Sequence, residues 1–517
     1  MTSVLWRDTV DAERLARLRL PRDDIVREEQ AGADRFEGRD GPFLRWERRL
    51  SVSAAGPDRW AVEERIDYRL AVRYWAWLLA GPARDAARRP RHDGRQPWWA
   101  PPGRLDARAA AVLDGLAALA LVTGFLGTLV GQTMTFAADE FGASDRAQSF
   151  ALGVIRIGVL AALVLAVVAD RRGRRIVLIG SAAAGIVFAA TGALMPSLVA
   201  LTASQVVGRS FATTMGTLIP VVAAEEMPAG SRAWALSVLA MAGSLGAGVA
   251  VMALPLADLG ERAWRLVYLV PLLALPLVVD VARRLPESHR FERHRAAPPP
   301  ERDSGGRATR TLRGHRRRFA MLATVGFLVA LMVAPAAQLR NEYLRDERGF
   351  SATGISVFII ATNTPGGLGV LAGGWLADRR GRRRIGAVAL VGGSLGTALF
   401  FLADGWSMWA WALASTIVGA AAIPALRVYE PELFPTALRG RAGGSLAVIG
   451  LIGSTAGLFA AGLLTDVFDD LGSAIAVLAV GPVLAGLVIV AFYPETVRLE
   501  LEDLNPSDRE PSPRRAS

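Results

Sequence analysis

The chain repeats a charged motif at a fixed spacing, and this repeat limits the folds that it can adopt. The segment Asp170–Arg175, with the sequence Asp-Arg-Arg-Gly-Arg-Arg, recurs 208 residues later as Asp378–Arg383. Two further motifs recur in nearly the same register: Glu225, Pro228 and Arg232 return 207 residues later as Glu432, Pro435 and Arg439, and Pro286-Glu287-Ser288 returns 208 residues later as Pro494-Glu495-Thr496. Unrelated motifs that share one register indicate that the chain consists of two similar halves.

Long apolar blocks separate these motifs and place both halves in a membrane. Hydrophobic residues make up 52% of the 517 residues, and they gather in about twelve blocks, each near the ~20 residues that a helix needs to cross a bilayer. The predicted spans are 109–133, 147–169, 175–195, 198–220, 233–257, 264–282, 319–339, 353–377, 385–403, 406–429, 443–464 and 473–493. We expect an all-α integral membrane fold with twelve transmembrane helices in two six-helix parallel repeats, 108–282 and 319–497, joined by an Arg- and Pro-rich linker, 283–318.

A polar N-terminal extension precedes the first apolar block. Residues 1–107 lack the positively charged start and apolar run of a signal peptide, so we expect them to stay in the cytosol. Apolar and polar residues alternate over 46–52 and 60–70, which predicts a β-hairpin. The apolar and then Arg-rich stretch 74–91 suits either an amphipathic segment in the membrane interface or a core helix of the extension. A small α+β extension is expected, linked to the membrane by the Pro- and Trp-rich segment 96–103.

The placement of arginine predicts the orientation in the membrane. The linker and the two Asp-Arg-Arg-Gly-Arg-Arg turns fall on one side if the helices alternate in direction. Acidic residues gather on the other side: Asp139, Glu140, Asp145, Asp258, Glu261, Asp404, Asp466, Asp469 and Asp470. By the positive-inside rule the arginine-rich side is cytosolic. We therefore predict a multi-pass protein of the cell membrane with both termini, including a tail at 498–517, in the cytosol.

Composition argues against other classes of function. The net charge of +11 raises the question of nucleic-acid binding. However, the arginines occupy short loops and form no continuous basic face with interleaved aromatic residues. There is no Cys, and the four His residues show no ligand spacing, so we expect no metal site. No Ser-His-Asp, metal or phosphate-loop motif is present, and we expect neither a cofactor nor an enzyme.

The duplicated loops carry a resemblance to a known family. The segment Gly374–Arg383 resembles the signature turn between the second and third helices of each half in the major facilitator superfamily. In the first half Asp170–Arg175 matches this turn, with Ala166 where the pattern has its leading Gly. The loop at Glu225–Arg232 and its counterpart Glu432–Gly440 resemble loops of the sugar-porter-like branch. The resemblance covers most of residues 109–500 and implies a transporter that works by alternating access.

For the charged loops, the resemblance implies a cytosolic gate of ion pairs that form in one access state and break in the other. The candidates are Asp170, Arg174, Glu225 and Arg232 in the first half, and Asp378, Arg382, Glu432 and Arg439 in the second. An exposed ion pair contributes only ~0–1 kcal/mol. A network of several pairs is therefore able to bias a two-state equilibrium without locking it.

Two arginines lie inside apolar blocks, where a charge that faces lipid costs ~2.5–3.5 kcal/mol. Arg156 and Arg209 must therefore face a cavity or a partner. Three roles stay open: bidentate binding of a carboxylate, proton coupling, or a tie between helices through backbone carbonyls. The resemblance weakens the second role, because Leu126 stands where many relatives place an Asp, and Asp114 lies near the cytosolic start of its helix. Other polar candidates for the solute path are Gln132, Gln205, Gln338 and Asn363.

Taken together, the sequence predicts a monomeric transporter of a small organic solute, with membrane lipid around it and protons as a candidate coupling ion. Sugar as the solute has little support. The helix around Gln338 lacks the paired Gln of sugar porters, and the fifth and tenth helices lack amides. Two alternatives stay open: an efflux pump for amphipathic compounds, and a membrane sensor that reads a solute without moving it.

Overall fold

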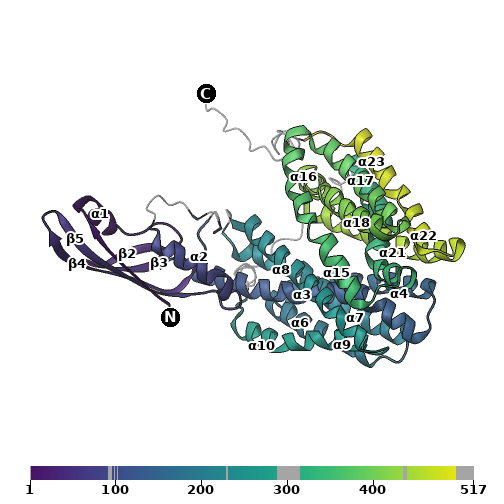
Figure 1. Cartoon of the computed structure of the whole chain (residues 1–517), viewed down its shortest axis with the longest axis horizontal. Coiled ribbons are helices and arrows are strands. Elements are labelled where there is room, and N and C mark those ends of the chain that lie inside the picture. The colour runs from purple at the N-terminus through teal and green to yellow at the C-terminus, as the bar shows by residue number, and fades with distance from the viewer. Residues whose placement is uncertain are drawn as a thin grey trace.

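The computed structural model of the chain describes residues 2–90, 96–97, 99–101, 103–228, 231–287, 315–434 and 439–496. An N-terminal domain, purple in Figure 1, projects from a helical body that has one blue-to-teal half and one green-to-yellow half. Most of the predicted linker and the whole of the predicted tail fall outside the described residues.

The N-terminal domain is a five-stranded antiparallel sheet with two helices. Its elements are β1 (Thr2–Val10), α1 (Ala12–Leu18), β2 (Arg27–Gly32), β3 (Arg35–Asp40), β4 (Phe43–Gly56), β5 (Arg59–Leu70) and α2 (Ala76–Arg88), in the strand order β1-β5-β4-β3-β2. The predicted hairpin is present as β4 and β5, with Leu50 opposite Glu64. The sheet is larger than the predicted hairpin. Strands β2 and β3 are short and carry too few apolar residues to show the alternation of apolar and polar side chains that predicts a strand.

Helix α2 is in part a core helix of the domain, and the membrane-interface alternative stays a prediction. Ala83, Ala86 and Ala87 are buried and pack in the core of the domain. Trp77 and Leu78, in the first turn, are 73% and 50% exposed. The second half of the helix is therefore a core helix, while its first turn presents apolar side chains to the surroundings.

A buried charge network holds the sheet to its helices. The Arg48 and Glu28 side chains are almost fully buried and form an ion pair with 2.7 Å between Nη2 and Oε2. Trp46 Nε1 donates to the other Glu28 oxygen at 2.8 Å, and Arg48 donates to the carbonyls of Leu18 and Leu20 at 2.7 and 2.9 Å. Because the charges have partners on every side, the desolvation of each ion is compensated within the domain.

Substitution of Glu28 by Ala is expected to destabilise the domain by about 3–5 kcal/mol, because it leaves the Arg48 charge buried without its carboxylate. Amide hydrogen exchange of the intact protein measures this as faster exchange in β4. The control is Glu29→Ala, which removes an exposed carboxylate from the same strand. Equal exchange in the two variants would contradict this account of the network.

Over the residues that the structure describes, the body contains twelve helices that are long and apolar enough to span a membrane, as predicted. The first half consists of α3 (Ala107–Phe141), α4 and α5 (Asp145–Ile157, Val159–Arg172), α6 with η1 (Arg174–Thr191, Gly192–Leu194), α7 (Leu198–Glu226), α8 with η3 (Arg232–Ala253, Leu254–Leu259), and α9, η4 and α10 (Trp264–Leu269, Val270–Ala274, Leu275–Arg284). The second half consists of α13 (Arg316–Gln338), α15 and α16 (Ala352–Asn363, Gly366–Arg380), α17 (Arg382–Leu402), α18 and α19 (Gly405–Ala420, Ala422–Arg427), α21 (Arg439–Phe468), and α22 and α23 (Leu471–Leu478, Val480–Phe492). Short segments connect them: α14 (Arg340–Glu342), the π-helical η5 (Tyr343–Glu347) and α20 (Tyr429–Glu432).

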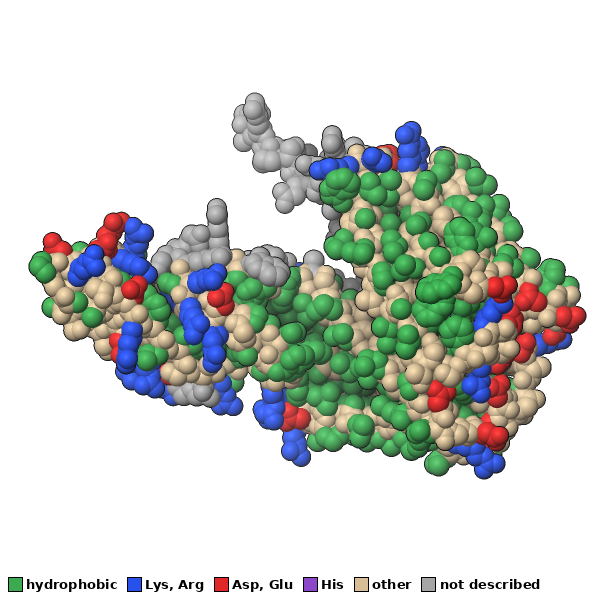
Figure 2. Space-filling view, viewed as in Figure 1, with side chains coloured by type: hydrophobic (Ala, Val, Ile, Leu, Met, Phe, Trp, Pro, Cys, Tyr) green, Lys and Arg blue, Asp and Glu red, His purple; other side chains and the backbone are tan. Residues whose placement is uncertain are grey.

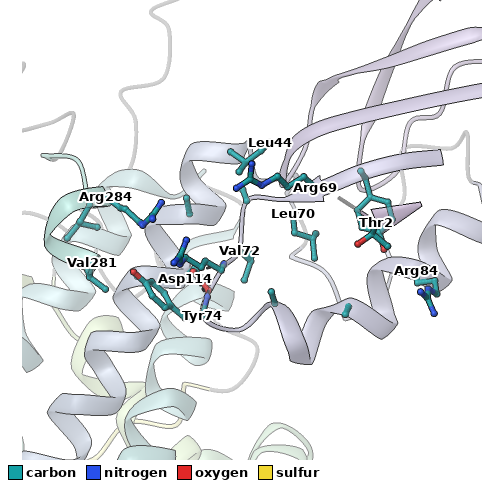
Figure 3. A pocket seen from close by; sticks show the side chains of 18 of the residues that line it. Thr2, Leu44, Arg69, Leu70, Val72, Tyr74, Arg84, Asp114, Val281 and Arg284 are labelled. Atoms are coloured by element: carbon teal, nitrogen blue, oxygen red, sulfur yellow. Dashed lines mark hydrogen bonds between the residues drawn. The ribbon is translucent and has the colours of Figure 1, made fainter. Parts of the chain in front are cut away.

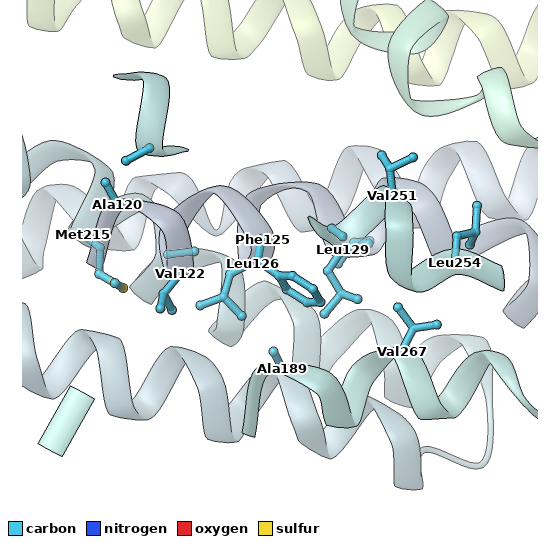
Figure 4. Close-up of a cluster of buried hydrophobic side chains, with 14 of the residues drawn as sticks. Ala120, Val122, Phe125, Leu126, Leu129, Ala189, Met215, Val251, Leu254 and Val267 are labelled. Carbon is cyan, nitrogen blue, oxygen red and sulfur yellow. The ribbon is translucent and has the colours of Figure 1, made fainter. Parts of the chain in front are cut away.

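Each half is built on one close helix pair, which needs glycine. In the first half, a Cβ on Gly246 of α8 would lie 1.9 Å from the carbonyl oxygen of Leu121 on α3. In the second half, a Cβ on Gly457 of α21 would lie 2.1 Å from the carbonyl oxygen of Leu331 on α13. Helices in lipid associate through such backbone approaches, because the hydrophobic effect does not distinguish a neighbouring helix from lipid. Figure 4 shows α3 at the centre of the apolar core of the first half, with Leu126 among its buried side chains.

A carboxylate in the first membrane helix fastens the N-terminal domain to the body. The Asp114 side chain accepts from the backbone N–H of Arg73 and Trp75 at 2.8 and 3.1 Å, and from that of Tyr74 at 3.0 Å. The Tyr74 hydroxyl donates to Asp280 of α10 at 2.8 Å. Figure 3 shows Tyr74 and Asp114 beside one another at this junction, next to a cavity of about 650 Å³. The hydrogen bonds of Asp114 therefore hold the N-terminal domain on the body.

Substitution of Asp114 by Ala is expected to release the segment after β5, because three backbone N–H groups donate to this one carboxylate. A buried charged acceptor of this kind contributes about 1.5–3 kcal/mol, so the amides of residues 73–75 are expected to exchange roughly tenfold to a hundredfold faster. Mass-spectrometric hydrogen exchange measures this. Asp85→Asn, which removes an exposed carboxylate of α2, serves as the control. Unchanged protection of 73–75 in the Asp114 variant would contradict the anchoring role.

Candidate functional site

The two halves meet at one end of the body and separate at the other. We call the end that carries the turns Asp170–Arg175 and Asp378–Arg383 the arginine-rich end, and the opposite end the acidic end. In Figure 1 the halves approach each other near α4 and α21 and diverge toward α16 and α8. Figure 2 shows a hollow between the halves that opens on the side of the N-terminal domain, and acidic side chains gathered at the far end. The structure is thus closed at the acidic end and open at the arginine-rich end.

Polar contacts close the acidic end. Asp258 accepts from the first backbone N–H groups of α15, those of Ala352 and Thr353, at 2.8 Å each. Further contacts join the two halves: Arg345 with Asp139 at 2.6 Å, Arg146 with Asp466 at 3.0 Å, Asn341 with the Gln132 carbonyl at 2.9 Å, and the stacked rings of Phe150 and Phe459 at 4.6 Å. Within the described ranges, no ion pair joins the halves at the arginine-rich end. The structure therefore represents one of the two access states that alternating access requires.

The repeated Pro-Glu motif caps the repeated turn. Glu287 accepts from the backbone N–H of Arg174 at 3.0 Å, and Glu495 accepts in the same way from Arg382 at 2.9 Å. Each carboxylate thus lies at the first turn of a helix, where N–H groups lack partners and the helix dipole favours negative charge. Gly381 has φ +102°, and a Cβ there would lie 2.6 Å from Glu495. The sequence shows both motifs, but only the fold shows that each pair forms one unit.

The predicted gate residues pair within each half in this state. Arg174 contacts Glu225, and Arg382 Nη1 lies 2.5 Å from Glu432. Arg232 is exposed and donates to the Met227 carbonyl at 3.3 Å. The side chains of Asp170, Asp378 and Arg439 fall outside the described set. The gate between the halves stays a prediction.

Substitution of Glu495 by Ala is expected to loosen the turn before α17, because the first amides of that helix lose their acceptor. The expected loss is about 0.5–2 kcal/mol, the usual range for a helix cap, and it would appear as faster exchange of the Arg382 and Arg383 amides. Glu287→Ala should do the same at Arg174 and leave the second turn unchanged, so each variant is the control for the other. An equal effect of both variants on both turns would contradict local capping.

Two arginines face the interior between the halves, and their partners are neutral. Arg209 of α7 donates through Nη1 to the Gly127 carbonyl of α3 at 2.6 Å. Arg156 of α4 reaches the other half: with the Gln338 amide oxygen turned toward it, Nη2 and Nε donate to that oxygen at 2.6 and 3.0 Å. Both contacts lie along α3, since Arg209 reaches Gly127 and Gln338 packs beside Gly131, one turn further on. Among the described side chains, neither forms an ion pair. The bond to Gly127 is the helix tie that the sequence left open, and it occupies one of the five donors of Arg209.

The other predicted polar residues divide into two groups. Gln132 takes part in the contact between halves, since its side-chain oxygen and its carbonyl both accept from Asn341. Gln205 is buried and donates to the Ala189 carbonyl at 3.3 Å, inside the first half. Asn363 accepts from Arg340 at 3.1 Å, inside the second half. The structure therefore brings Arg156 to Gln338 and Gln132 to Asn341, while Gln205 and Asn363 contact only their own halves.

Two charged residues directly after α13 give no functional signal in the sequence. Glu342 is 2% exposed and accepts from Gln148 of the other half, and Arg340 approaches the Phe400 ring at 6.0 Å. Arg340 and Glu342 follow the last apolar residue of the predicted span 319–339, so the sequence places both in a loop. Buried charge in such a loop appears only when the facing half covers it.

Comparison with known proteins agrees with this architecture. The profile of the Major Facilitator Superfamily matches residues 116–362 and 322–516. The chain belongs to this superfamily. No curated protein matches the chain by sequence. This superfamily member is a multi-pass membrane transporter of the alternating-access type, as its sequence predicted.

Solved structures of transporters share its fold at low identity. The nucleoside transporter NupG, as a D323A mutant, is 14% identical, with a TM-score of 0.63 over 74% of this chain and 100% of that one. A bacterial homolog of the human lysosomal transporter Spinster, inward-facing and unoccupied, is 15% identical, with a TM-score of 0.62 over 78% and 99%. The inward-open xylose transporter XylE from E. coli is 17% identical, with a TM-score of 0.61 over 77% and 99%. The superfamily profile begins at residue 116, after the N-terminal domain.

Proposed function

We propose that this transporter carries a small organic anion whose carboxylate binds between Arg156 and Arg209. One observation carries the proposal: two neighbouring guanidiniums in the interior of the body have only neutral partners among the described residues. Two unneutralised charges in an interior site are costly, and a carboxylate relieves the cost by bidentate hydrogen bonds. Neutral solutes, such as the xylose and nucleosides of the similar transporters, would leave both charges uncompensated.

The contact between Arg156 and Gln338 supports a site that both halves share. Arg156 belongs to α4 in the first half, and Gln338 ends α13 in the second. A ligand shifts a conformational equilibrium only if it binds the two states differently. A solute that engages Arg156 competes with Gln338, so its binding changes a contact between the halves. The candidates Arg156, Arg209 and Gln338 then act together, with Gln132 and Asn341 on the path toward the acidic end.

The orientation and the gate are parts of the same proposal. Arginine in the duplicated turns supports a cytosolic arginine-rich end, with the termini on that side of the cell membrane. The present state is then inward-open. Asp170, Arg174, Glu225, Arg232 and their counterparts Asp378, Arg382, Glu432 and Arg439 form the gate that closes this end in the other state. Proton coupling belongs to the proposal too, and one similar structure is a D-xylose–proton symporter.

The test is a thermal-shift screen of the purified protein against mono- and dicarboxylates, sugar acids, neutral sugars, nucleosides and cationic dyes, because a ligand stabilises the state that it binds by RT ln(1 + [L]/Kd). We expect carboxylates to stabilise the protein. Replacement of Arg156 or Arg209 by Ala is expected to weaken binding by about ten- to a hundredfold, since a hydrogen bond to a charged group contributes about 1.5–3 kcal/mol.

Flux in proteoliposomes completes the test. Uptake of the carboxylate hit by the wild type, lost in the Arg156 and Arg209 variants, supports an anion transporter. The matched control is Arg262→Ala, because Arg262 is an exposed arginine of the same half and its partner, Glu140, belongs to that half as well. A neutral or cationic ligand that binds equally to all variants would overturn the anion proposal. Binding without flux would favour the sensor.

A further inference from the structure

A buried carboxyl between the halves is left without a donor for one of its oxygens. Glu342 is 2% exposed. Gln148 of α4, also buried, donates through Nε2 to Glu342 Oε2, and the same amide nitrogen lies 3.1 Å from Thr135 Oγ1. Glu342 Oε1 is fully buried and finds no hydrogen-bond donor among the described residues. A carboxylate oxygen buried without a donor carries the full desolvation cost of its charge.

A second carboxyl, from the other half, lies close to this carboxyl. Asp145, the first residue of α4, lies one turn before Gln148, which bonds Glu342, so its carboxylate acts on Glu342 from the same helix end. Two carboxylates are acceptors only, so they repel each other when both are ionised, and they form a hydrogen bond when one carries a proton. Asp145 is exposed. The pair therefore joins the buried oxygen to the solvent of the acidic end.

The charges around the pair add to this effect. From η5, Asp346 and Glu347 face Glu342 with further negative charge. From α3, the Asp139 carboxylate is already paired with Arg345. Burial is the main cause that raises the pKa of Glu342 well above its usual range, and the neighbouring carboxylates raise it further.

We propose that Glu342 and Asp145 form a proton-binding site shared by the two halves, which holds the acidic end closed when it is occupied. A proton from the solvent at that end binds the Glu342 carboxylate and gives the neutral acid, whose O–H donates to Asp145; no other bond changes. When the proton is lost, both carboxyls are ionised and repel each other. Separation of the halves then lowers the free energy further, because water hydrates the charge of Glu342. The site deepens the proposed transport function by naming a residue pair that links protons to the access state.

The direction of the pH effect follows from linkage. The closed state has the raised pKa, so closure is fully favoured at a pH below the pKa of Glu342 in the open state. The preference is lost as the pH rises toward the pKa of the closed state. With one proton, the ratio of closed to open molecules falls by up to tenfold per pH unit in that window.

The experiment measures closure without any solute. Because the chain has no Cys, two introduced cysteines carry the only spin labels. Leu194→Cys and Trp406→Cys place them on exposed positions of the two halves at the acidic end. Pulsed electron–electron double resonance between pH 5 and 9 then gives the fraction with the short, closed distance. We expect this fraction in the wild type to fall as the pH rises.

Two variants separate the site from general charge effects. Glu342→Gln keeps the size, the acceptor for Gln148 and a donor toward Asp145, so it imitates the protonated state and should stay closed at every pH. Asp145→Asn supplies the missing donor, so closure should no longer require the proton. Glu261→Gln, which removes an exposed charge at the same end, should keep the wild-type profile.

A closed fraction that is constant with pH in the wild type, or a wild-type titration in Glu342→Gln, would overturn the proposal. Retention of the wild-type titration by Asp145→Asn alone would overturn the shared site. Because no solute takes part, these outcomes are independent of the transport assay. A wild type that closes with acid but moves no solute would refute the proposed function and leave the proton site in place.

Discussion

Inside a bilayer no water is present to satisfy a polar group, and this constraint accounts for most of the body. The membrane-spanning segments of this body are therefore helical. Where a helix breaks, the backbone groups that lose their partners need a hydrogen bond from elsewhere in the protein. The second membrane helix breaks at Gly158, between α4 and α5, and there the Ser210 hydroxyl of α7 donates to the Gly158 carbonyl at 2.7 Å. The eighth breaks at Thr364 and Pro365, where proline cannot donate. Buried charge obeys the same rule, since each guanidinium in the interior reaches a carbonyl or an amide.

The two halves satisfy this constraint with equivalent contacts between equivalent residues. The helices of the α3–α8 pair and of the α13–α21 pair approach each other at glycine residues. Each of the two Asp-Arg-Arg-Gly turns is capped by the glutamate that follows the last helix of the same half. Such units let each half move as one rigid body. The charged and polar residues that differ between the halves, Arg156, Arg209, Gln338 and Glu342, lie where one half faces the other. Symmetry thus accounts for the scaffold, and its departures mark the positions where solute and proton are proposed to act.

The N-terminal domain adds a second layer to this scaffold. It has its own buried ion network at Arg48 and Glu28, and it is tied to α3 and α10 through Asp114 and Asp280. The junction lies at the arginine-rich end, where the halves are apart. The domain is therefore fixed to one half, and a change in the access state moves the other half relative to it.

The sequence alone determined the number of membrane helices, the duplication and the superfamily, because these depend on the length of apolar runs and on motifs that are contiguous in the chain. It also identified Arg156 and Arg209, since a charge inside an apolar run is conspicuous. Only the tertiary structure decided the five-stranded sheet, the capping of each turn by Glu287 and Glu495, the anchoring role of Asp114, and the burial of Glu342. The physical reason is common to all four: burial and hydrogen-bond partners come from other segments of the chain or from the opposite half, and no local pattern records which of these groups covers a given side chain.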